Sequence, residues 1–345
     1  MSEIRTPGDS GVLAARVYRG HQVEAWHRAS IVVVEGDGAI RCAAGDPDLV
    51  TLGRSSLKPL QLFPLLASGA ADHFCLAPEQ LAIMAGSHTG TDAHRAVVDR
   101  NLRASQHGAG HLQCGSHWPL WMQEQKLFPT GGEERDPLRH NCSGKHSGFL
   151  ALARHLGDAS ERYLDPDSPT QRQVRQALSD LCEVELSSLE PAVDGCSAPN
   201  YALPLVQLAR AYLKLARARA DRSVEQTHLA RIRGAMLAHP EMVSGQGRLD
   251  LDLACALPGR LVAKIGAEAI ELIALAEPEL AIAIKVHDGN MRALGAICVE
   301  VLCQLGVLDP AHLPPSLQRH ARPEVRNDRG LLSGHLEACL RLRTV

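Results

Sequence analysis

A serine and a lysine three positions apart could support nucleophilic catalysis. Ser55 and Lys58 would lie on one face of a first helical turn. The N-terminus of a helix stabilises an alkoxide and disfavours a protonated amine. A lysine whose pKa falls toward neutrality can take the serine proton and so create an acyl-transfer nucleophile. The alternative is a serine that caps the helix beside an exposed lysine.

Two later segments could complete this centre. Ser87 lies in the glycine-flanked segment 86–90, where backbone N–H groups can approach a ligand closely. A plain turn between two helices is the alternative for this segment. Lys264 lies on an expected late strand, shortly before Gly266. An S-x-x-K motif is found in penicillin-recognising hydrolases, and the order of these three elements favours one shared site.

Two cysteines could hold a zinc ion. Cys142 and Cys196 each precede an expected helix, and two thiolates with a third donor make a zinc site with an open fourth position. On general grounds the third donor is the imidazole of His140 or His146, because a protonated lysine cannot donate. Two unrelated buried cysteines, or a cysteine nucleophile beside a histidine, are the alternatives.

The elements that position these residues are expected to form one α/β domain over residues 1–345. Strands are predicted over 12–18, 30–34, 39–42, 259–265, 270–275 and 281–286. Helices are predicted over 92–105, 147–155, 170–183, 201–218, 223–238, 291–305 and 331–342, with a loop over 114–137. The antiparallel sheet therefore draws on both ends of the chain, from residues 12–50 and 259–305. Residues 55–238 are mainly helical, and 309–345 form a C-terminal tail.

Composition excludes several classes of protein. The 345 residues carry 36 Lys and Arg against 39 Asp and Glu, a balance that argues against nucleic-acid binding. The chain has no apolar run of about 18 residues that could span a membrane. Its polar first ten residues do not form a signal peptide. The ten scattered cysteines indicate a reduced, cytoplasmic protein, in which most thiols, including Cys255, are small buried hydrophobic groups.

Five segments resemble one known family, the L-asparaginases of the Rhizobium etli type, which are unrelated to the bacterial two-domain asparaginases. These segments are 53–59, 84–88, 140–146, 193–196 and 263–268, and the resemblance runs from about residue 12 to 305. It implies a serine β-lactamase-like fold, usually a homodimer. It also implies hydrolysis of L-asparagine to aspartate and ammonia.

The resemblance implies two Ser–Lys tandems in one pocket. Ser55 with Lys58 matches the first tandem, and Ser87 with Lys264 matches the second. Ser55 would attack the side-chain amide after Lys58 removes its proton, and water would then cleave the acyl-enzyme. Ser87 and Lys264 would relay protons or activate that water.

The resemblance also implies a bound zinc held by Cys142, Lys145, Cys196 and a water. The third protein ligand is then a lysine, where general zinc chemistry favours a histidine. Lysine can serve as a ligand when metal binding displaces its proton. The metal is expected to shape the pocket or to help bind the substrate.

Three charged or polar residues are candidates for binding the substrate. Arg54 and Asp194 suit the α-carboxylate and α-ammonium groups of an amino acid. His146 is a third candidate, and an ordinary surface ion pair is the alternative for Arg54. Two other functions stay open: a β-lactamase or penicillin-binding hydrolase, despite the missing S-D-N motif, and a non-enzymatic zinc or redox sensor.

Overall fold

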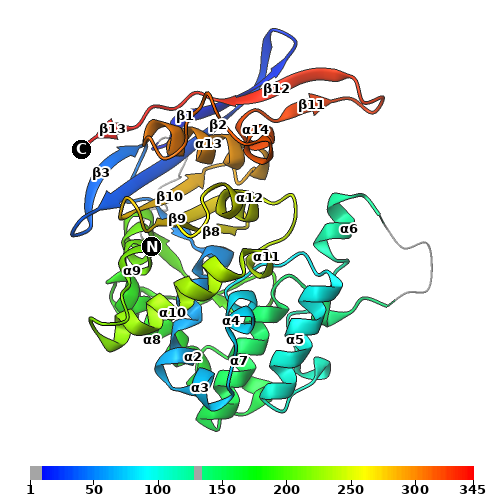
Figure 1. Cartoon of the computed structure of the whole chain (residues 1–345), viewed down its shortest axis with the longest axis vertical. Coiled ribbons are helices and arrows are strands. Elements are labelled where there is room, and N and C mark those ends of the chain that lie inside the picture. Colours follow the sequence, from blue (N-terminus) through cyan, green and yellow to red (C-terminus); the bar gives the residue numbers. More distant parts are fainter. Residues whose placement is uncertain (1–9, 128–133) are drawn as a thin grey trace, which may run out of the picture.

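The computed structural model describes residues 10–127 and 134–345. The N-terminal residues 1–9 and residues 128–133 of the predicted loop lie outside the described residues, so the signal-peptide prediction stays a prediction. Figure 1 shows a sheet with its covering helices at one end of the molecule and a helical region at the other.

One antiparallel sheet joins the two ends of the chain. Its strands are β1 (Val12–Arg19), β2 (Gln22–Glu35), β3 (Ala39–Ala44), β8 (Leu261–Gly266), β9 (Ile270–Leu275), β10 (Leu280–Val286), β11 (Glu324–Arg326), β12 (Leu332–Ala338) and β13 (Arg343–Thr344). Within the described residues their order is β11-β12-β1-β2-β10-β9-β8, with β3 paired to β2 and β13 paired to β3. The long strand β2 pairs with β10, so that Val32 faces Ala283. The predicted α/β architecture, with a sheet built from both termini, is confirmed.

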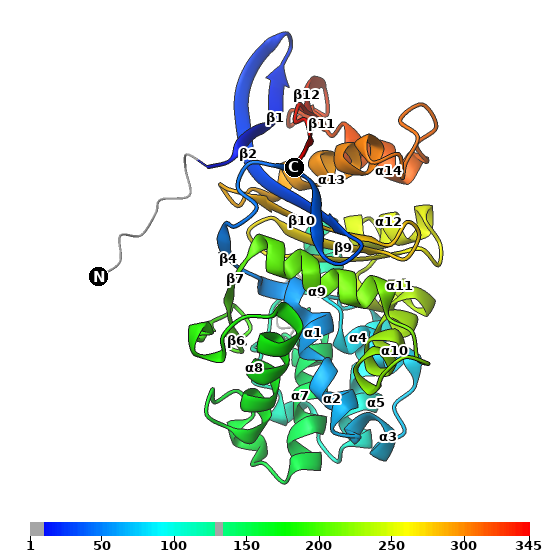
Figure 2. The same cartoon turned by 90° about the vertical axis from the view of Figure 1, so that its left-hand side faces the viewer.

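Helices cover both faces of this sheet, as Figure 2 shows. Helix α9 (Leu205–Arg217) packs on one face, and α13 (Met291–Gln304) packs on the other with α12 (Leu249–Ala256) and α14 (Pro315–Ala321) nearby. Side chains of a strand alternate between the faces, so Val32 enters one apolar core and Ile31 enters the other. Burial on both faces explains why β9 and β10 are almost continuously apolar.

The helical region lies on the side of the sheet that α9 covers. Its helices are α1 (Lys58–Gln61), α2 (Phe63–Ala67), α3 (Ala70–His73), α4 (Pro78–Met84), α5 (Asp92–Ala104), α6 (Leu120–Glu124), α7 (Ser143–Leu156), α8 (Pro169–Cys182), α10 (Val224–Ala238) and α11 (Pro240–Val243). The helices predicted over 92–105, 147–155, 170–183, 201–218, 223–238 and 291–305 are confirmed, with ends that differ by a few residues. Helix α7 begins four positions earlier than predicted, so Lys145 and His146 lie in its first turn.

Two small antiparallel pairs position loops of the site. Strand β4 (Val50–Leu52) pairs with β7 (Ala202–Pro204), and Gly53 N–H donates to the Tyr201 carbonyl 3.1 Å away. Strand β5 (Ala192–Val193) pairs with β6 (Pro199–Asn200) and closes the loop that carries Asp194 and Cys196.

The helix predicted over 331–342 is wrong, because this segment forms strand β12 instead. Gly334 and Leu336 point inward with the two-residue period of a strand, and Leu336 lies opposite Val17 of β1. A Cβ atom on Gly334 would collide with the carbonyl oxygen of Tyr18. The glycine therefore permits a close strand contact that helical periodicity does not reveal.

Two further expectations can be compared with the described residues. Cys255, expected to be buried, is exposed because it lies on the outer side of α12, whereas Cys182 and Cys298 are buried. None of the helices in the described ranges is long and apolar enough to cross a membrane.

Candidate active site

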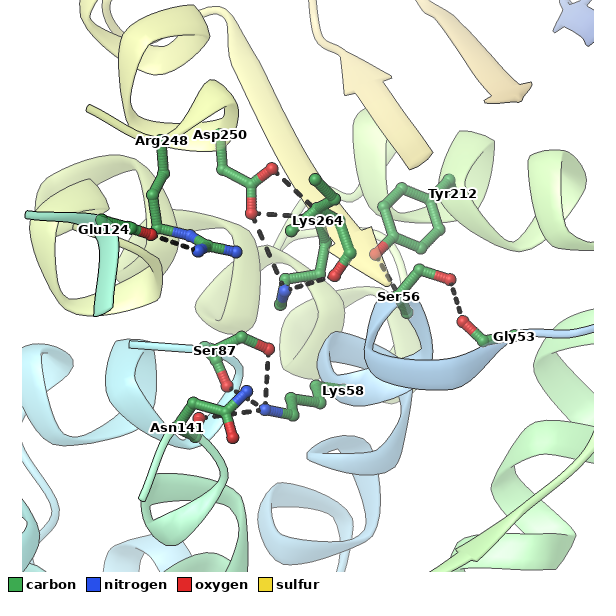
Figure 3. Close-up of polar contacts among 12 residues, drawn as sticks. Gly53, Ser56, Lys58, Ser87, Glu124, Asn141, Tyr212, Arg248, Asp250 and Lys264 are labelled. Atoms are coloured by element: carbon green, nitrogen blue, oxygen red, sulfur yellow. Dashed lines mark hydrogen bonds and ion pairs between the residues drawn. The ribbon is translucent and has the colours of Figure 1, made fainter. Parts of the chain in front are cut away.

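The amine of Lys58 is surrounded by polar atoms of Gly86, Ser87 and Asn141 (Figure 3). Its Nζ atom is 2.6 Å from the Gly86 carbonyl, 3.3 Å from the Asn141 carbonyl and 2.8 Å from Ser87 Oγ. The side chain is 1% exposed, and this burial lowers the pKa of Lys58 below its usual value. Lys58 is thus suited to exchange a proton with Ser87.

Ser55 lies three positions before Lys58, in the 3-10 turn Arg54–Leu57 that comes shortly after β4. It is half-buried, and no hydrogen bond of its hydroxyl is found within the described residues. The next serine has a structural role, because Ser56 Oγ donates to the Gly53 carbonyl at 2.5 Å. The Ser55–Lys58 pair is therefore close in sequence, but in the described part of the chain no hydrogen bond joins the two side chains.

The turn that carries Ser55 has an unusual backbone. Arg54 has a left-handed φ of 49°, and its N–H donates to Asn200 Oδ1 at 3.0 Å. Gly266 of β8 packs closely behind the turn, since a Cβ atom there would lie 3.1 Å from the Gly53 carbonyl oxygen. Such local strain is common at functional sites and persists only where neighbouring contacts enforce it.

Ser87 is fixed by the segment that follows α10. Ser87 N–H donates to the Val243 carbonyl at 2.7 Å, and Thr89 N–H donates to the Ser244 carbonyl at 3.2 Å. A Cβ atom on Gly86 would lie 2.7 Å from the Met242 carbonyl oxygen, so glycine permits this close contact. The segment is thus more than a plain turn between helices.

Lys264 reaches the same region from the sheet. Figure 3 shows its side chain across a gap from Ser87 and Lys58. It is fully buried on β8, donates to the Ile265 carbonyl at 2.7 Å, and its Nζ lies 3.7 Å from Asp250 Oδ2. Burial lowers the pKa of Lys264 to about 8. No hydrogen bond between Ser87 and Lys264 is found in the described residues.

Three residues of this region were missed by the sequence analysis. Asn141 supplies a carbonyl to Lys58, Asn200 holds the backbone of the 3-10 turn, and Asp250 faces Lys264. A signal for Asp250 existed in segment 249–253, where two aspartates alternate with leucines. A carboxylate in such an apolar helix needs a buried partner.

The two cysteines of the predicted zinc site lie together at the start of α7. Cys142 is the N-cap residue of this helix, and Lys145 in the first turn donates to Cys196 Sγ at 3.1 Å. The Cys142 thiol beside Cys196 lowers the pKa of Cys196, and Lys145 and His146 add to this effect. Burial alone would lower the pKa of Lys145, but Cys196 and Cys142 raise it.

The donor set of this cluster fits zinc. Two buried thiols and an amine converge, and cysteine sulfur is a preferred zinc ligand. In the part of the chain that the structure describes, no group of three His, Cys, Asp or Glu side chains is arranged to hold a metal. Lys145 contacts Cys196 directly, and His146 also lies beside Cys196, so the third donor stays a prediction.

Arg54 and Asp194 form a half-buried ion pair, with Nε 2.9 Å from Oδ1. Asp194 also accepts hydrogen bonds from Gly195 N–H at 2.7 Å and from Asn200 Nδ2 at 3.2 Å. A cavity of about 430 Å³ opens beside Arg54 and is also lined by Glu268. The pair thus lies at the edge of a space that can admit a small polar molecule.

His146 lies deeper than the other candidates for substrate binding. Its Nδ1 atom is 2.7 Å from the Tyr163 hydroxyl, and its buried Nε2 forms no hydrogen bond within the described residues. Burial lowers the pKa of His146 to about 4, so its ring is neutral. The structure places it beside the Cys196 cluster.

Enzymes that hydrolyse amides and esters can use a buried lysine beside a serine hydroxyl as the base that activates a nucleophile. The sequence profile described as L-asparaginase II matches residues 15–338, and the chain belongs to this family. It is accordingly an amidohydrolase of the L-asparaginase type. This result confirms the family resemblance of the five sequence segments.

Other comparisons are more distant. No curated protein matches the chain. One similar solved structure is a beta-lactamase from Mycobacterium bovis, with 14% identity over 80% of this chain and 94% of that one and a TM-score of 0.34. Another is a protein named Mglu in its native form, with 13% identity, coverage of 83% and 67%, and a TM-score of 0.38. The architecture described above rests on the chain's own strands and helices.

Proposed function

We propose that the protein hydrolyses L-asparagine to L-aspartate and ammonia through an acyl-enzyme formed on serine. The family supplies the reaction class. The observation that carries the mechanism is the fully buried Lys58 amine, 2.8 Å from Ser87 Oγ.

The contacts of Lys58 suit a neutral amine. Its two N–H groups would donate to the carbonyls of Gly86 and Asn141, which leaves the nitrogen lone pair for the hydroxyl proton of Ser87. Burial favours this uncharged form. Lys58 then acts as general base toward Ser87.

Ser55 is the proposed nucleophile because its half-buried hydroxyl has no competing hydrogen bond within the described residues. Its oxygen attacks the side-chain amide carbon, and its proton passes to Ser87 as the Ser87 proton passes to Lys58. The tetrahedral intermediate collapses when the C–N bond breaks and ammonia leaves. After ammonia has left, Lys58 holds the proton taken from Ser55, and Lys264 has given one to the leaving nitrogen. Transfer of a proton from Lys58 through Ser87 to Lys264 restores the neutral Lys58 amine. Lys58, acting through Ser87, then takes a proton from the water molecule that attacks the ester, and it returns this proton to Ser55 when the ester C–O bond breaks.

Lys264 is the proposed proton donor to the leaving nitrogen. Its ammonium lies beside Asp250 and faces Ser87 and Lys58 across the gap (Figure 3). A donor with a pKa of about 8 can give up its proton readily near neutral pH. Backbone N–H groups, including that of Ser55, would stabilise the oxyanion.

Arg54 and Asp194 are proposed to bind the α-carboxylate and α-ammonium groups of asparagine. Both side chains are already ordered by one another and by Asn200, so few side-chain conformations are lost on binding. His146 is proposed to support the substrate pocket through Cys196, because it is fully buried.

We further propose that Cys142, Lys145 and Cys196 hold zinc. The ion would supply a fixed positive charge that shapes the pocket. Replacement of both Cys142 and Cys196 by serine is expected to abolish stoichiometric zinc in the purified protein. Unchanged zinc by elemental analysis would refute the site.

A homodimer in the cytoplasm is the proposed state of the enzyme. All ten cysteines lie in the described residues and none forms a disulfide, which suits a reducing compartment. Sedimentation would test the dimer.

Ammonia release by a Ser55→Ala variant tests the nucleophile. Loss of a catalytic serine typically removes on the order of 10⁶ in kcat, so near-complete inactivation is expected. Retained activity would exclude Ser55 and favour Ser87. Turnover of nitrocefin instead of asparagine would favour a β-lactamase. Zinc binding without any amide turnover would favour a sensor.

A further inference from the structure

Asp250 is a buried carboxylate with no role in the family resemblance or in the sequence analysis. It lies in the first turn of α12 and is 3% exposed. Both of its oxygens accept the N–H of Ile265, each at 3.2 Å, and Oδ2 lies 3.7 Å from Lys264 Nζ. Asp250 therefore fixes α12 to β8 at the lysine that faces the serine cluster (Figure 3).

The other charged and titratable groups that act on Lys264 come from three directions. Lys58 approaches from α1, Arg248 precedes α12, and Glu271 lies on β9. Arg248 is directed by Glu124 of α6, whose Oε1 lies 2.7 Å from Nη1. Arg248 is a cation, and Lys58 becomes one when it takes the serine proton, so both disfavour a charge on Lys264 when it must donate.

Glu271 supports the charge of Lys264 less than Asp250 does. It is fully buried, and neither carboxyl oxygen forms a hydrogen bond within the described residues. Burial and the nearby Asp250 raise the pKa of Glu271 well above its usual value. The raised pKa makes Glu271 a weaker counter-ion, and Asp250 is the carboxylate that forms the ion pair with Lys264.

We propose that Asp250 is a positioning residue, which holds the ammonium of Lys264 toward Ser87 and keeps it charged for donation to the leaving nitrogen. This inference rests on the proposed role of Lys264 as proton donor. Without the carboxylate, burial, Arg248 and the newly protonated Lys58 would favour a neutral Lys264 amine that cannot donate in the same way. Asp250 acts through Lys264 and does not contact the substrate.

The experiment is the pH profile of kcat/KM for asparagine in Asp250→Asn. The amide keeps an oxygen acceptor for Ile265 N–H and removes the charge, so the fold is largely preserved. Loss of an opposite charge lowers a lysine pKa, typically by about 1–3 units. The alkaline limb, expected near pH 8 in the wild type, should therefore move to lower pH by about one unit or more.

Three matched variants separate this role from a structural one. Asp250→Glu keeps the charge and should return the limb close to its wild-type position. Glu271→Gln replaces the weaker buried acid by an isosteric amide and should move the limb less than Asp250→Asn does. Asp252→Asn removes another buried aspartate of α12, which pairs with Arg319 and His320 of α14 at 2.5 and 2.7 Å, and should also leave the limb in place.

The outcomes are distinct. An unmoved limb in folded Asp250→Asn, or an equal shift in Asp252→Asn, would overturn the inference. If Asp250→Asn does not fold, Asp250→Glu decides, since a limb displaced by a full unit despite the retained charge would contradict it. A wild-type enzyme without asparaginase activity would instead refute the proposed function.

Discussion

Two buried lysines at the starts of helices have pKa values that are shifted in opposite directions. Lys58 begins α1 and contacts two carbonyls and a hydroxyl, and its pKa is lowered. Lys145 lies in the first turn of α7 and contacts the Cys196 thiol, and its pKa is raised despite equal burial. Burial sets the penalty for the charge, and the partner decides whether that penalty is overcome. One lysine is therefore suited to proton transfer and the other to pairing with sulfur.

The largest effect is expected for Lys58→Met, which removes the proposed base. Loss of a general base typically lowers the rate by about 10²–10⁴-fold, so kcat should fall by this amount with little change in KM. Zinc content should stay at the wild-type level, because Lys58 is not among the proposed ligands. A variant with normal kcat would show that the serine chemistry does not need this amine.

Lys145→Met is the matched change in the second lysine. Zinc affinity should fall at least about 10–100-fold, the loss typical even of residues that only support metal ligands. Activity should fall less than in Lys58→Met, and added zinc should partly restore it. Elemental analysis and titration with zinc measure the two effects. Equal losses of kcat in both variants would erase the distinction between the lysines.

Arg54→Gln tests whether Arg54 binds the α-carboxylate of asparagine, a role that neither lysine is proposed to have. A charged hydrogen bond contributes about 1.5–3 kcal/mol, so KM for asparagine should rise by roughly tenfold to a hundredfold. The control substrate is asparagine α-amide, in which an uncharged amide replaces the α-carboxylate. The variant and the wild type should differ little with that substrate. An equal loss with both substrates would remove Arg54 from carboxylate binding.

The smallest effect concerns stability and the buried carboxyl of Glu271. Its pKa is raised in the folded state, so above pH 4.5 the unfolded chain releases a proton that the folded chain retains. Stability therefore falls as pH rises, by about 1.4 kcal/mol per unit from this group until the folded-state pKa is reached. Glu271→Gln should flatten that slope in denaturant unfolding just above the ordinary carboxyl pKa. The exposed Glu225→Gln is the control, and identical slopes in all three proteins would contradict a raised pKa of Glu271.

Sequence patterns predicted the elements better than the contacts between them. The strand over 270–275 was predicted from its short, mostly apolar sequence, which Glu271 alone interrupts. The tail was misassigned because Gly334 acts through its close approach to β1, which periodicity does not encode. The Lys58–Ser87 contact joins residues 29 positions apart on different elements, so spacing along one helix could not reveal it. Asp250 was missed for the same reason, since it lies on helix α12 and its partner Lys264 lies on strand β8.

The pairing of β2 with β10 has a consequence for synthesis of the chain. Val32 meets Ala283 only after most of the sequence has left the ribosome, and Lys264 is delivered by the neighbouring strand β8. Contacts between such distant segments form slowly, because a long loop must close first. The nascent polypeptide therefore carries both serines and Lys58 long before it can hold Lys264, the proposed proton donor, in place. On this proposal the site is complete only when the two strand-forming parts of the chain have paired.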